Sequence, residues 1–170
     1  GSYDPNDKAA HPEGYDADHY LEPNTDITYR IRFQNTGTDT AFTVIIRDTL
    51  SPWLDPLSVR PQTASHPYTW DYAAEGSVLK FTFNDILLPD SFVNEPASNG
   101  FVEFRISQKA DVPLGTFIRN DAAIYFDFNP PVITNEVFHT VGREFITVSV
   151  DAPLPGMPDL KVFPNPFRDA

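Results

Sequence analysis

The sequence predicts an all-β fold, and three observations lead to this prediction. Apolar and polar residues alternate with a period of two in several short stretches, which puts one set inside a sheet and the other in water. Clusters of turn-forming residues separate these stretches. The 170 residues also include 14 Phe and 7 Tyr beside a single Met, which favours strands. No helix is needed to account for any part of the chain.

The clearest stretch runs from Tyr29 to Leu50. Its first arm alternates polar residues with four apolar ones, Ile27, Tyr29, Ile31 and Phe33. Its second arm alternates in the same way around Phe42, Val44 and Ile46. Between the arms, residues 35–40 (NTGTDT) supply the Asn, Gly and Asp that a chain reversal needs. We therefore predict that the two arms pair as an antiparallel unit.

The segments on either side of this unit are less regular. Residues 3–26 are polar, contain three prolines and show no sustained periodicity, so we expect an extended lead-in. Residues 51–67 contain four prolines, which interrupt strand pairing. This segment is predicted to be a crossing loop with only a short edge strand at Leu57–Arg60.

The rest of the chain adds further strands. Residues 68–72 and 78–83 alternate around Glu75-Gly76 and predict a second hairpin, and residues 102–107 predict another strand. More strands are expected in 115–128 and 132–150. About eight short strands fit a two-layer, immunoglobulin-like antiparallel sandwich, with a closed barrel as the lesser alternative.

Length, charge and composition limit the possible functions. A chain of 170 residues is one domain's worth. A net charge of −12 and a pI near 4.5 argue against binding to nucleic acid, which depends on Lys and Arg. No apolar run is long enough to span a membrane. The absence of cysteine excludes disulfides and zinc–thiolate sites.

Several motifs then follow one another in a fixed order over residues 4–142. They are YRIRFQNTGTDTAFTVIIRDTL, SHPY, LPDS, NEPASNGFVEF and NDAAIYFDFNPPVITN. In this combination the chain resembles a family of β-sandwich surface-repeat modules with an NTG…DTL pattern. Such modules stand next to the C-terminal sorting domain of type IX-secreted Bacteroidetes proteins. The resemblance implies a secreted or cell-surface protein.

The predicted organisation has four parts. Gly1-Ser2 looks like a remnant of cloning, and residues 3–150 are expected to form the sandwich module. Residues 151–158 (DAPLPGMP) are a proline-rich linker. Residues 159–170 include KVFPNPFRDA, which is similar to the opening of the type IX sorting domain, although PNP is also an ordinary turn. The resemblance implies the secretion machinery as a partner, through a sorting domain whose body is missing.

Enzyme signatures are absent from the sequence. There is no G-x-S-x-G, no H-E-x-x-H and no glycine-rich phosphate loop. We therefore predict a non-catalytic structural or spacer module. The alternative is an adhesive module that binds carbohydrate or protein, in which case Trp53, in a proline-rich loop, is the expected exposed platform. Trp70 alternates within a strand and is expected in the core.

Calcium is the cofactor that the sequence favours. Asp4, Asn6 and Asp7 place three oxygen-bearing side chains close together near the N-terminus, and Asp127 and Asn129, with Asn135, place more at the end of a predicted strand. Calcium takes six to eight such oxygen ligands. The alternative is that these residues are turn formers bonded to their own backbone.

A different chemistry is suggested by Lys8, Asp48 and Asn120. These are the residue types of an intramolecular Lys-to-Asn amide bond assisted by a buried carboxylate, as in related surface sandwiches. The reaction requires Lys8 to be buried and neutral beside Asn120, with Asp48 protonated. Lys8 lies in PNDKAAHP, which does not alternate like a strand. We therefore expect an exposed or salt-bridged Lys8, and the amide bond is the lesser alternative.

Overall fold

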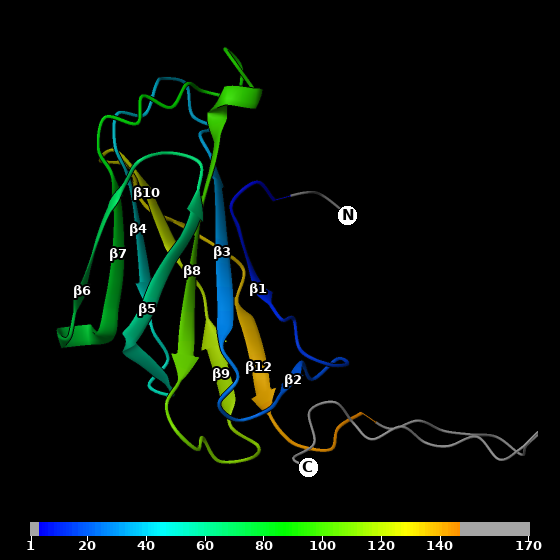
Figure 1. Cartoon of the computed structure of the whole chain (residues 1–170). Coiled ribbons are helices and arrows are strands. Elements are labelled where there is room, and N and C mark those ends of the chain that lie inside the picture. Colours follow the sequence, from blue (N-terminus) through cyan, green and yellow to red (C-terminus); the bar gives the residue numbers. More distant parts are fainter. Residues whose placement is uncertain (1–3, 147–170) are drawn as a thin grey trace, which may run out of the picture.

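The computed structural model describes residues 4–146 (Figure 1). Within this range the chain is all-β and has no α-helix, with two short 3-10 turns at Glu75–Ser77 and Pro96–Ser98. The predicted fold class is confirmed. The predicted cloning remnant, linker and sorting-domain start, with the last residues of the predicted module, lie outside the described residues.

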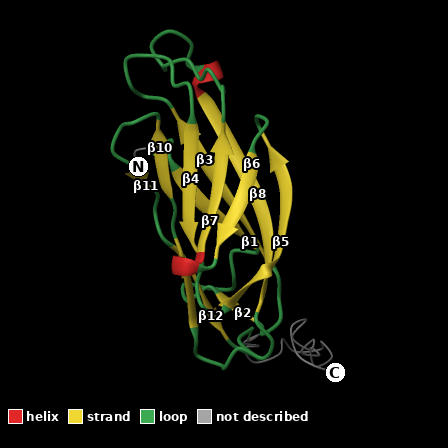
Figure 2. Cartoon of the chain, turned by 90° about the vertical axis from the view of Figure 1, so that its left-hand side faces the viewer, coloured by secondary structure: helices red, strands yellow, loops and turns green. Residues whose placement is uncertain are grey.

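Two larger sheets form the layers of the sandwich, and their strands run along the long axis of the molecule (Figure 2). The first sheet has the order β1 (Asp7–His11), β3 (Ile27–Gln34), β8 (Asn99–Gln108), β5 (Leu54–Ala64). The second has the order β11 (Val132–Ile133), β10 (Ala123–Phe126), β4 (Val44–Thr49), β7 (Val78–Phe83), β6 (Thr69–Ala73).

A third, smaller sheet extends one end of the sandwich. It has the order β2 (Tyr20–Leu21), β12 (Val137–Val141), β9 (Phe117–Asn120). Its β2–β12 pair is parallel, whereas all other strand pairs among the described residues are antiparallel. The described residues thus form twelve strands rather than about eight, because several predicted stretches divide into two strands and the lead-in contributes two more.

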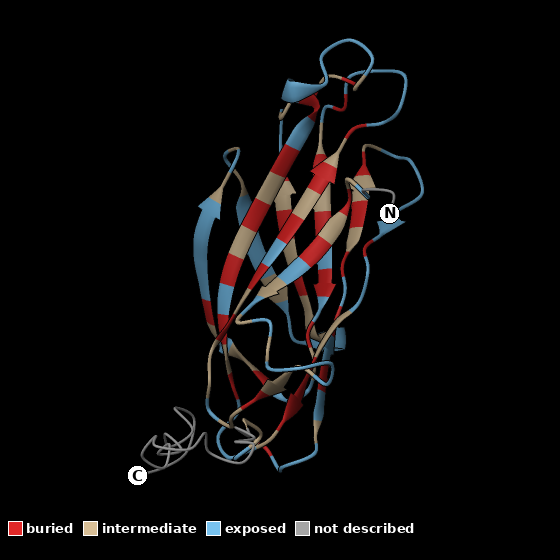
Figure 3. Cartoon of the chain, turned by 90° about the vertical axis from the view of Figure 1, so that its right-hand side faces the viewer, coloured by how far each residue is buried: buried red, intermediate tan, exposed pale blue. Residues whose placement is uncertain are grey.

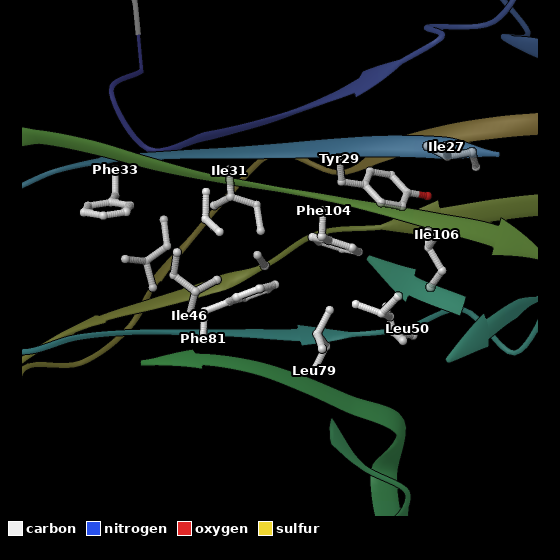
Figure 4. Close-up of a cluster of buried hydrophobic side chains, with 14 of the residues drawn as sticks. Ile27, Tyr29, Ile31, Phe33, Ile46, Leu50, Leu79, Phe81, Phe104 and Ile106 are labelled. Carbon is white, nitrogen blue, oxygen red and sulfur yellow. The ribbon is translucent and has the colours of Figure 1, made fainter. Parts of the chain in front are cut away.

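The core lies between the two larger sheets, as the close-up in Figure 4 shows. Side chains of β3 and β8 point toward side chains of β4 and β7. The predicted alternation is confirmed in β3 and β7, where every second residue is fully buried. The buried residues of these two strands are Ile27, Tyr29, Ile31, Phe33, Leu79, Phe81 and Phe83.

The predicted pairing of the Tyr29–Leu50 arms is wrong. β3 pairs with β1 and β8 in the first sheet, whereas β4 pairs with β7 and β10 in the second. The connection between them crosses from one layer to the other, held by Asn35 Nδ2, which donates to the carbonyls of Asp39 and Leu88 at 2.8 and 2.9 Å. Alternation specifies which face is buried but not which strand is the neighbour, and two strands that face each other across a core alternate in the same way. Phe42 precedes β4 and is 60% exposed.

Two proline-bearing segments form more strand than predicted. β1 lies within the lead-in and pairs with β3 over five residues. β5 spans eleven residues instead of a short piece at Leu57–Arg60. It is an edge strand with two register shifts along β8, and an edge tolerates proline because one side of the strand needs no partner.

The predicted hairpin of β6 and β7 is confirmed. Thr69 pairs with Thr82 and Ala73 with Val78, and the turn between them contains Gly76 at a φ of 80°, which glycine adopts without strain. Trp70, however, is 40% exposed, so its predicted core position is wrong. β6 is the edge of its sheet, and most of its residues remain accessible.

Candidate functional site

The structure brings Lys8, Asp48 and Asn120 together in the interior. Lys8 comes from β1 in the first sheet, Asp48 from β4 in the second, and Asn120 from the end of β9 in the third. Their exposed fractions are 3%, 0% and 2%. The cluster therefore lies where the three sheets meet.

Of the two alternatives expected for Lys8, exposed or salt-bridged, the structure shows the salt-bridged one and places it in the interior. Lys8 is the one buried residue of β1, which explains why PNDKAAHP shows no apolar alternation although it forms a strand. Backbone pairing with β3 defines this strand. The buried position of β1 is occupied by a lysine, and Ala10 on the same face is half-buried against the core.

The Lys8 ammonium group contacts the Asp48 carboxylate directly, through Nζ and Oδ2. The side chains of both residues are completely inaccessible. Lys8 Nζ also lies 3.4 Å from the carbonyl oxygen of Asp121, the residue that follows Asn120. The ring of Tyr29 lies beneath the amine, with its centroid 4.4 Å from Nζ.

Asn120 is unusual because its buried amide lacks hydrogen-bond partners. Neither its Oδ1 nor its Nδ2 has a partner of good geometry, and the same holds for Asp48 Oδ1. The amide is nonetheless close to Asp48: burial raises the pKa of that carboxyl group, and Asn120 is among the groups that oppose the rise. Buried side-chain polar atoms are nearly always satisfied in folded proteins, so three unsatisfied atoms in one cluster set this site apart from an ordinary core.

Burial shifts the pKa values of both charged groups toward their neutral forms. Loss of hydration is the largest influence on the pKa of Asp48 and raises it, against the opposing effect of Lys8. Loss of hydration likewise lowers the pKa of Lys8, against the opposing effect of Asp48. The neutral amine and the neutral acid are thus brought closer in energy to the ion pair.

Two residues hold this cluster from the side of β12: Asn135, which the sequence suggested only as an oxygen ligand of calcium, and Thr134, which sequence reasoning missed. Asn135 Oδ1 accepts a hydrogen bond from the Lys8 amide, and Asn135 Nδ2 donates to the Lys8 carbonyl, both at 2.9 Å. The side chain of Asn135 thereby replaces a neighbouring strand for β1. Thr134 Oγ1 accepts from the Ala122 amide at 3.0 Å and fixes the backbone that follows Asn120. Thr134 has no signal in the sequence beyond its place in the NPPVITN motif, and Asn135 has only the oxygen-bearing side chain that led to the calcium prediction.

The N-terminal residues proposed for calcium have other partners. Asp4 Oδ1 accepts from the Asn6 amide at 2.9 Å, and Asn6 Oδ1 accepts from the Gln34 amide at 3.0 Å. Asp7 forms an ion pair with Arg32 through both carboxylate oxygens. These side chains brace the start of β1 against β3.

The residues proposed at the end of β10 also have a backbone role. Asp127 Oδ1 accepts from the amides of Phe42 and Thr43 at 2.9 and 2.8 Å, and Asn129 is exposed. Over residues 4–146, no group of three or more His, Asp or Glu side chains is placed to hold a metal ion. Calcium binding by these two clusters stays a prediction.

The aromatic platform predicted at Trp53 is half-accessible, with 38% of the residue exposed. A larger group of exposed apolar side chains occupies one end of the sandwich, where Asp127 binds the backbone at Phe42 and where the Ile86 amide bonds the Phe42 carbonyl. The loops at this end are coloured as exposed in Figure 3. The exposed apolar residues of these loops, here called the apolar tip, are Phe42, Leu87, Phe92, Val93 and Phe128.

Comparison with known families places the chain in one of them. Residues 4–140 match the family described as Domain of unknown function (DUF7619), and the chain belongs to this family. No protein of curated function matches the sequence.

Solved structures similar to this fold come from bacterial surface proteins. The full-length major pilin SpaD from Corynebacterium diphtheriae has a TM-score of 0.56 and is 22% identical, with 78% of this chain and 34% of that chain covered. The N-terminal domain of the Streptococcus gordonii adhesin Sgo0707 has a TM-score of 0.54 and is 12% identical, with 81% and 33% covered. A 35 kDa C-terminal fragment of the major pilin GBS80 of Streptococcus agalactiae has a TM-score of 0.51 and is 16% identical, with 81% and 56% covered.

These similarities establish the fold as the immunoglobulin-like sandwich that adhesin and pilin domains share. The chain spans only about a third of the length of the first two of these proteins. None of the helical segments in residues 4–146 has the length and apolar character needed to cross a membrane.

Proposed function

We propose that this domain is a non-catalytic structural module, a spacer in a secreted or cell-surface bacterial protein, next to a type IX secretion sorting signal. Three observations support the proposal. The fold is that of adhesin and pilin domains, the chain carries none of the enzyme motifs named above, and KVFPNPFRDA follows the module. The Bacteroidetes origin and the sorting role rest on the sequence resemblance.

The observation that carries a spacer role best is the direction in which the chain enters and leaves the sandwich. β1 and β12, the first and last strands of the described residues, both point toward the same end of the long axis (Figure 1). A pull on the N-terminal side acts backward along β1, and a pull on the C-terminal side acts forward along β12. Each strand is then loaded parallel to its own axis, so that several ladder hydrogen bonds with β3 or β9 have to break together.

Deletions in the full-length natural protein test this role. Removal of everything from Lys161 onward is expected to block delivery to the surface, because the sorting signal is lost. Removal of residues 3–150 is expected to leave export intact and to lower the persistence or display of the protein. Loss of export on removal of the sandwich alone would show that the module is part of the sorting signal, which contradicts the spacer role.

An adhesive role is the second candidate, and the apolar tip favours it. Phe92 is 90% exposed and Phe42 60%, at the end of the molecule where the strand-connecting loops meet. Exposed clusters of aromatic residues often mark binding surfaces. Screening against glycan arrays and host proteins tests this role: a hit abolished by the double variant Phe42→Ser and Phe128→Ser, or by Trp53→Ala, would support it.

A further inference from the structure

We propose that Lys8 and Asn120 form an intramolecular amide bond, from Lys8 Nζ to Asn120 Cγ, with Asp48 as the acid–base catalyst and Asn135 as a positioning residue. This inference goes beyond the proposed spacer role and does not depend on it. It concerns a covalent crosslink between the first and third sheets, made by the protein's own side chains.

Proximity is the first argument. Lys8 Nζ is already within 3.4 Å of the Asp121 carbonyl, so the amine has reached the backbone adjoining Asn120. Asp48 contacts the amine through Oδ2, and the Asn120 amide is close enough to influence the same carboxyl group. The nucleophile, the acid–base group and the acceptor amide thus meet in one buried site. Holding reactants in such contact replaces a slow bimolecular encounter by an intramolecular step.

The unsatisfied atoms are the second argument. A purely structural ion pair in a protein core is expected to satisfy the polar atoms around it, because each buried unpaired group destabilises the fold. Here both amide atoms of Asn120 and Asp48 Oδ1 lack partners. A crosslink accounts for this arrangement: it removes the Asn120 amide nitrogen as ammonia, and Asp48 is left beside the new amide.

The protonation state is the third argument. Attack on an amide requires a neutral amine, and an exposed lysine is protonated at neutral pH. Within the Lys8–Asp48 contact, transfer of one proton from Nζ to the carboxylate yields the neutral amine and the neutral acid without exchange with solvent. Both side chains are fully inaccessible, and the absence of water favours this neutral pair.

The proposed reaction is balanced without any other reactant. The neutral acid of Asp48 donates a hydrogen bond to Asn120 Oδ1, and the lone pair of Lys8 Nζ attacks Cγ to form the new C–N bond. Asp48 then delivers its proton to the leaving amide nitrogen and accepts one from Nζ. The bond from Cγ to Nδ2 breaks, ammonia leaves, and Asp48 is regenerated. No oxidant, metal or nucleotide is consumed.

Asn135 has a positioning role because it holds the backbone of Lys8 from the open side of β1. Its two hydrogen bonds to Lys8, together with the bond from Ala122 to Thr134, tie the nucleophile and the segment after Asn120 to the same pair of residues. Without them, β1 would be held by β3 alone among its strand neighbours. We therefore expect Asn135 to control how fast the bond forms.

The mass of the intact folded protein tests the proposal. We expect the purified chain to be lighter than its sequence mass by one ammonia, about 17 Da, because the amide bond forms with loss of that molecule. The variants Lys8→Met, Asn120→Ala and Asp48→Asn are each expected to have their full sequence mass. Lys109→Met, at an exposed lysine, is the matched control and should retain the loss.

Folding failure of a variant does not obscure the result, since the wild-type mass decides the question by itself. Full sequence mass in folded wild-type protein, even after prolonged incubation, would overturn the proposal. For Asn135→Ala we expect a crosslinked fraction that rises several-fold more slowly after synthesis, while Asn99→Ala, at an exposed asparagine, matches wild type. An unchanged rate in Asn135→Ala would overturn its positioning role.

Discussion

Asp7 and Lys8 are neighbours on β1, but their side chains lie on opposite faces and in opposite environments. Asp7 pairs with Arg32 at the surface, where the two side chains are 24% and 38% exposed. Lys8 pairs with Asp48 in the interior, where neither is exposed at all. Arg32 contacts both carboxylate oxygens of Asp7, whereas Lys8 contacts only Oδ2 of Asp48. The consequences of the two pairs differ because water screens the first and is excluded from the second.

The comparison teaches that burial decides what a charged pair can do. An exposed pair contributes little to stability and keeps its groups ionised. A buried pair loses the hydration of its charges, which favours the neutral forms of both groups. Removal of one partner then destabilises the fold strongly, because the other charge stays buried and unpaired. One strand therefore carries a surface brace and a reactive interior group, one residue apart.

The largest effect is expected from Lys8→Met. Removal of the amine leaves Asp48 buried without its partner and prevents the crosslink. Loss of one member of a buried pair costs about 3–5 kcal/mol. A crosslink that closes a loop as long as the one from Lys8 to Asn120 also lowers the entropy of the unfolded chain, and its loss costs roughly 4 kcal/mol more. Chemical denaturation should show a loss of at least about 3 kcal/mol, and a loss under about 1 kcal/mol would contradict the account.

A pH series on Lys8→Met sharpens the comparison. Burial raises the pKa of Asp48 above its ordinary value of 3.8, and the variant lacks the lysine that opposes this shift. The folded variant then binds more protons than the unfolded chain above that value, so its stability falls as pH rises. We expect the variant to be most stable near or below pH 3.8 and least stable at neutral pH, relative to the double variant Lys8→Met with Asp48→Asn. If the stability of the single variant and that of the double variant changed with pH in the same way, this prediction would be contradicted.

A much smaller effect is expected from Asp7→Ala. The Asp7–Arg32 pair is partly exposed, and such pairs contribute about 0–1 kcal/mol. The free energy of unfolding should therefore change by under about 1 kcal/mol, and added salt should shrink the difference further. The variant should still lose ammonia. If Asp7→Ala lowered the free energy of unfolding as much as Lys8→Met does, the difference in exposure would not explain the difference between the two ion pairs.

The smallest effect is expected from calcium, because the predicted ligands already have protein partners. If calcium binds the native state, millimolar calcium raises the melting temperature and chelator lowers it. Asp4→Ala and Asp127→Ala should each reduce that shift, measured against each variant's own metal-free value. Each variant needs its own metal-free value because Asp127 also accepts two backbone hydrogen bonds, so that Asp127→Ala changes the melting temperature without calcium. No shift in wild type would assign both clusters to turn chemistry.

The sequence predicted which face of a strand is buried, but it did not predict which strands are neighbours in a sheet. Alternation in β3 and β7 correctly predicted which residues are buried there, and the β6–β7 hairpin was predicted correctly as a pair of strands. It failed for the partner of β3, because hydrogen-bonded strands and strands facing across a core share one pattern. It also failed for Trp70, because edge position in a sheet is a property of the assembled topology.

The site shows the same limit. Lys8, Asp48 and Asn120 were identifiable by residue type, but the burial of Lys8 was not, because an inward lysine on a polar strand produces no periodic signal. Asn135 was suggested only as a calcium ligand, because a side chain that substitutes for a neighbouring strand is visible only after both segments are placed. The residue types of the site could therefore be predicted from the sequence, whereas their closeness in the folded chain could not.

A tryptic peptide map tests the central claim most directly, that the interior lysine of β1 is covalently joined to β9. Trypsin cleaves after Lys and Arg, so a modified Lys8 blocks cleavage at that position. We predict a branched species in which residues 1–30 are joined to residues 120–143, with fragment ions that place the link between Lys8 and Asn120. Recovery of free peptides 9–30 and 120–143 from folded wild-type protein, with no branched species, would contradict the account.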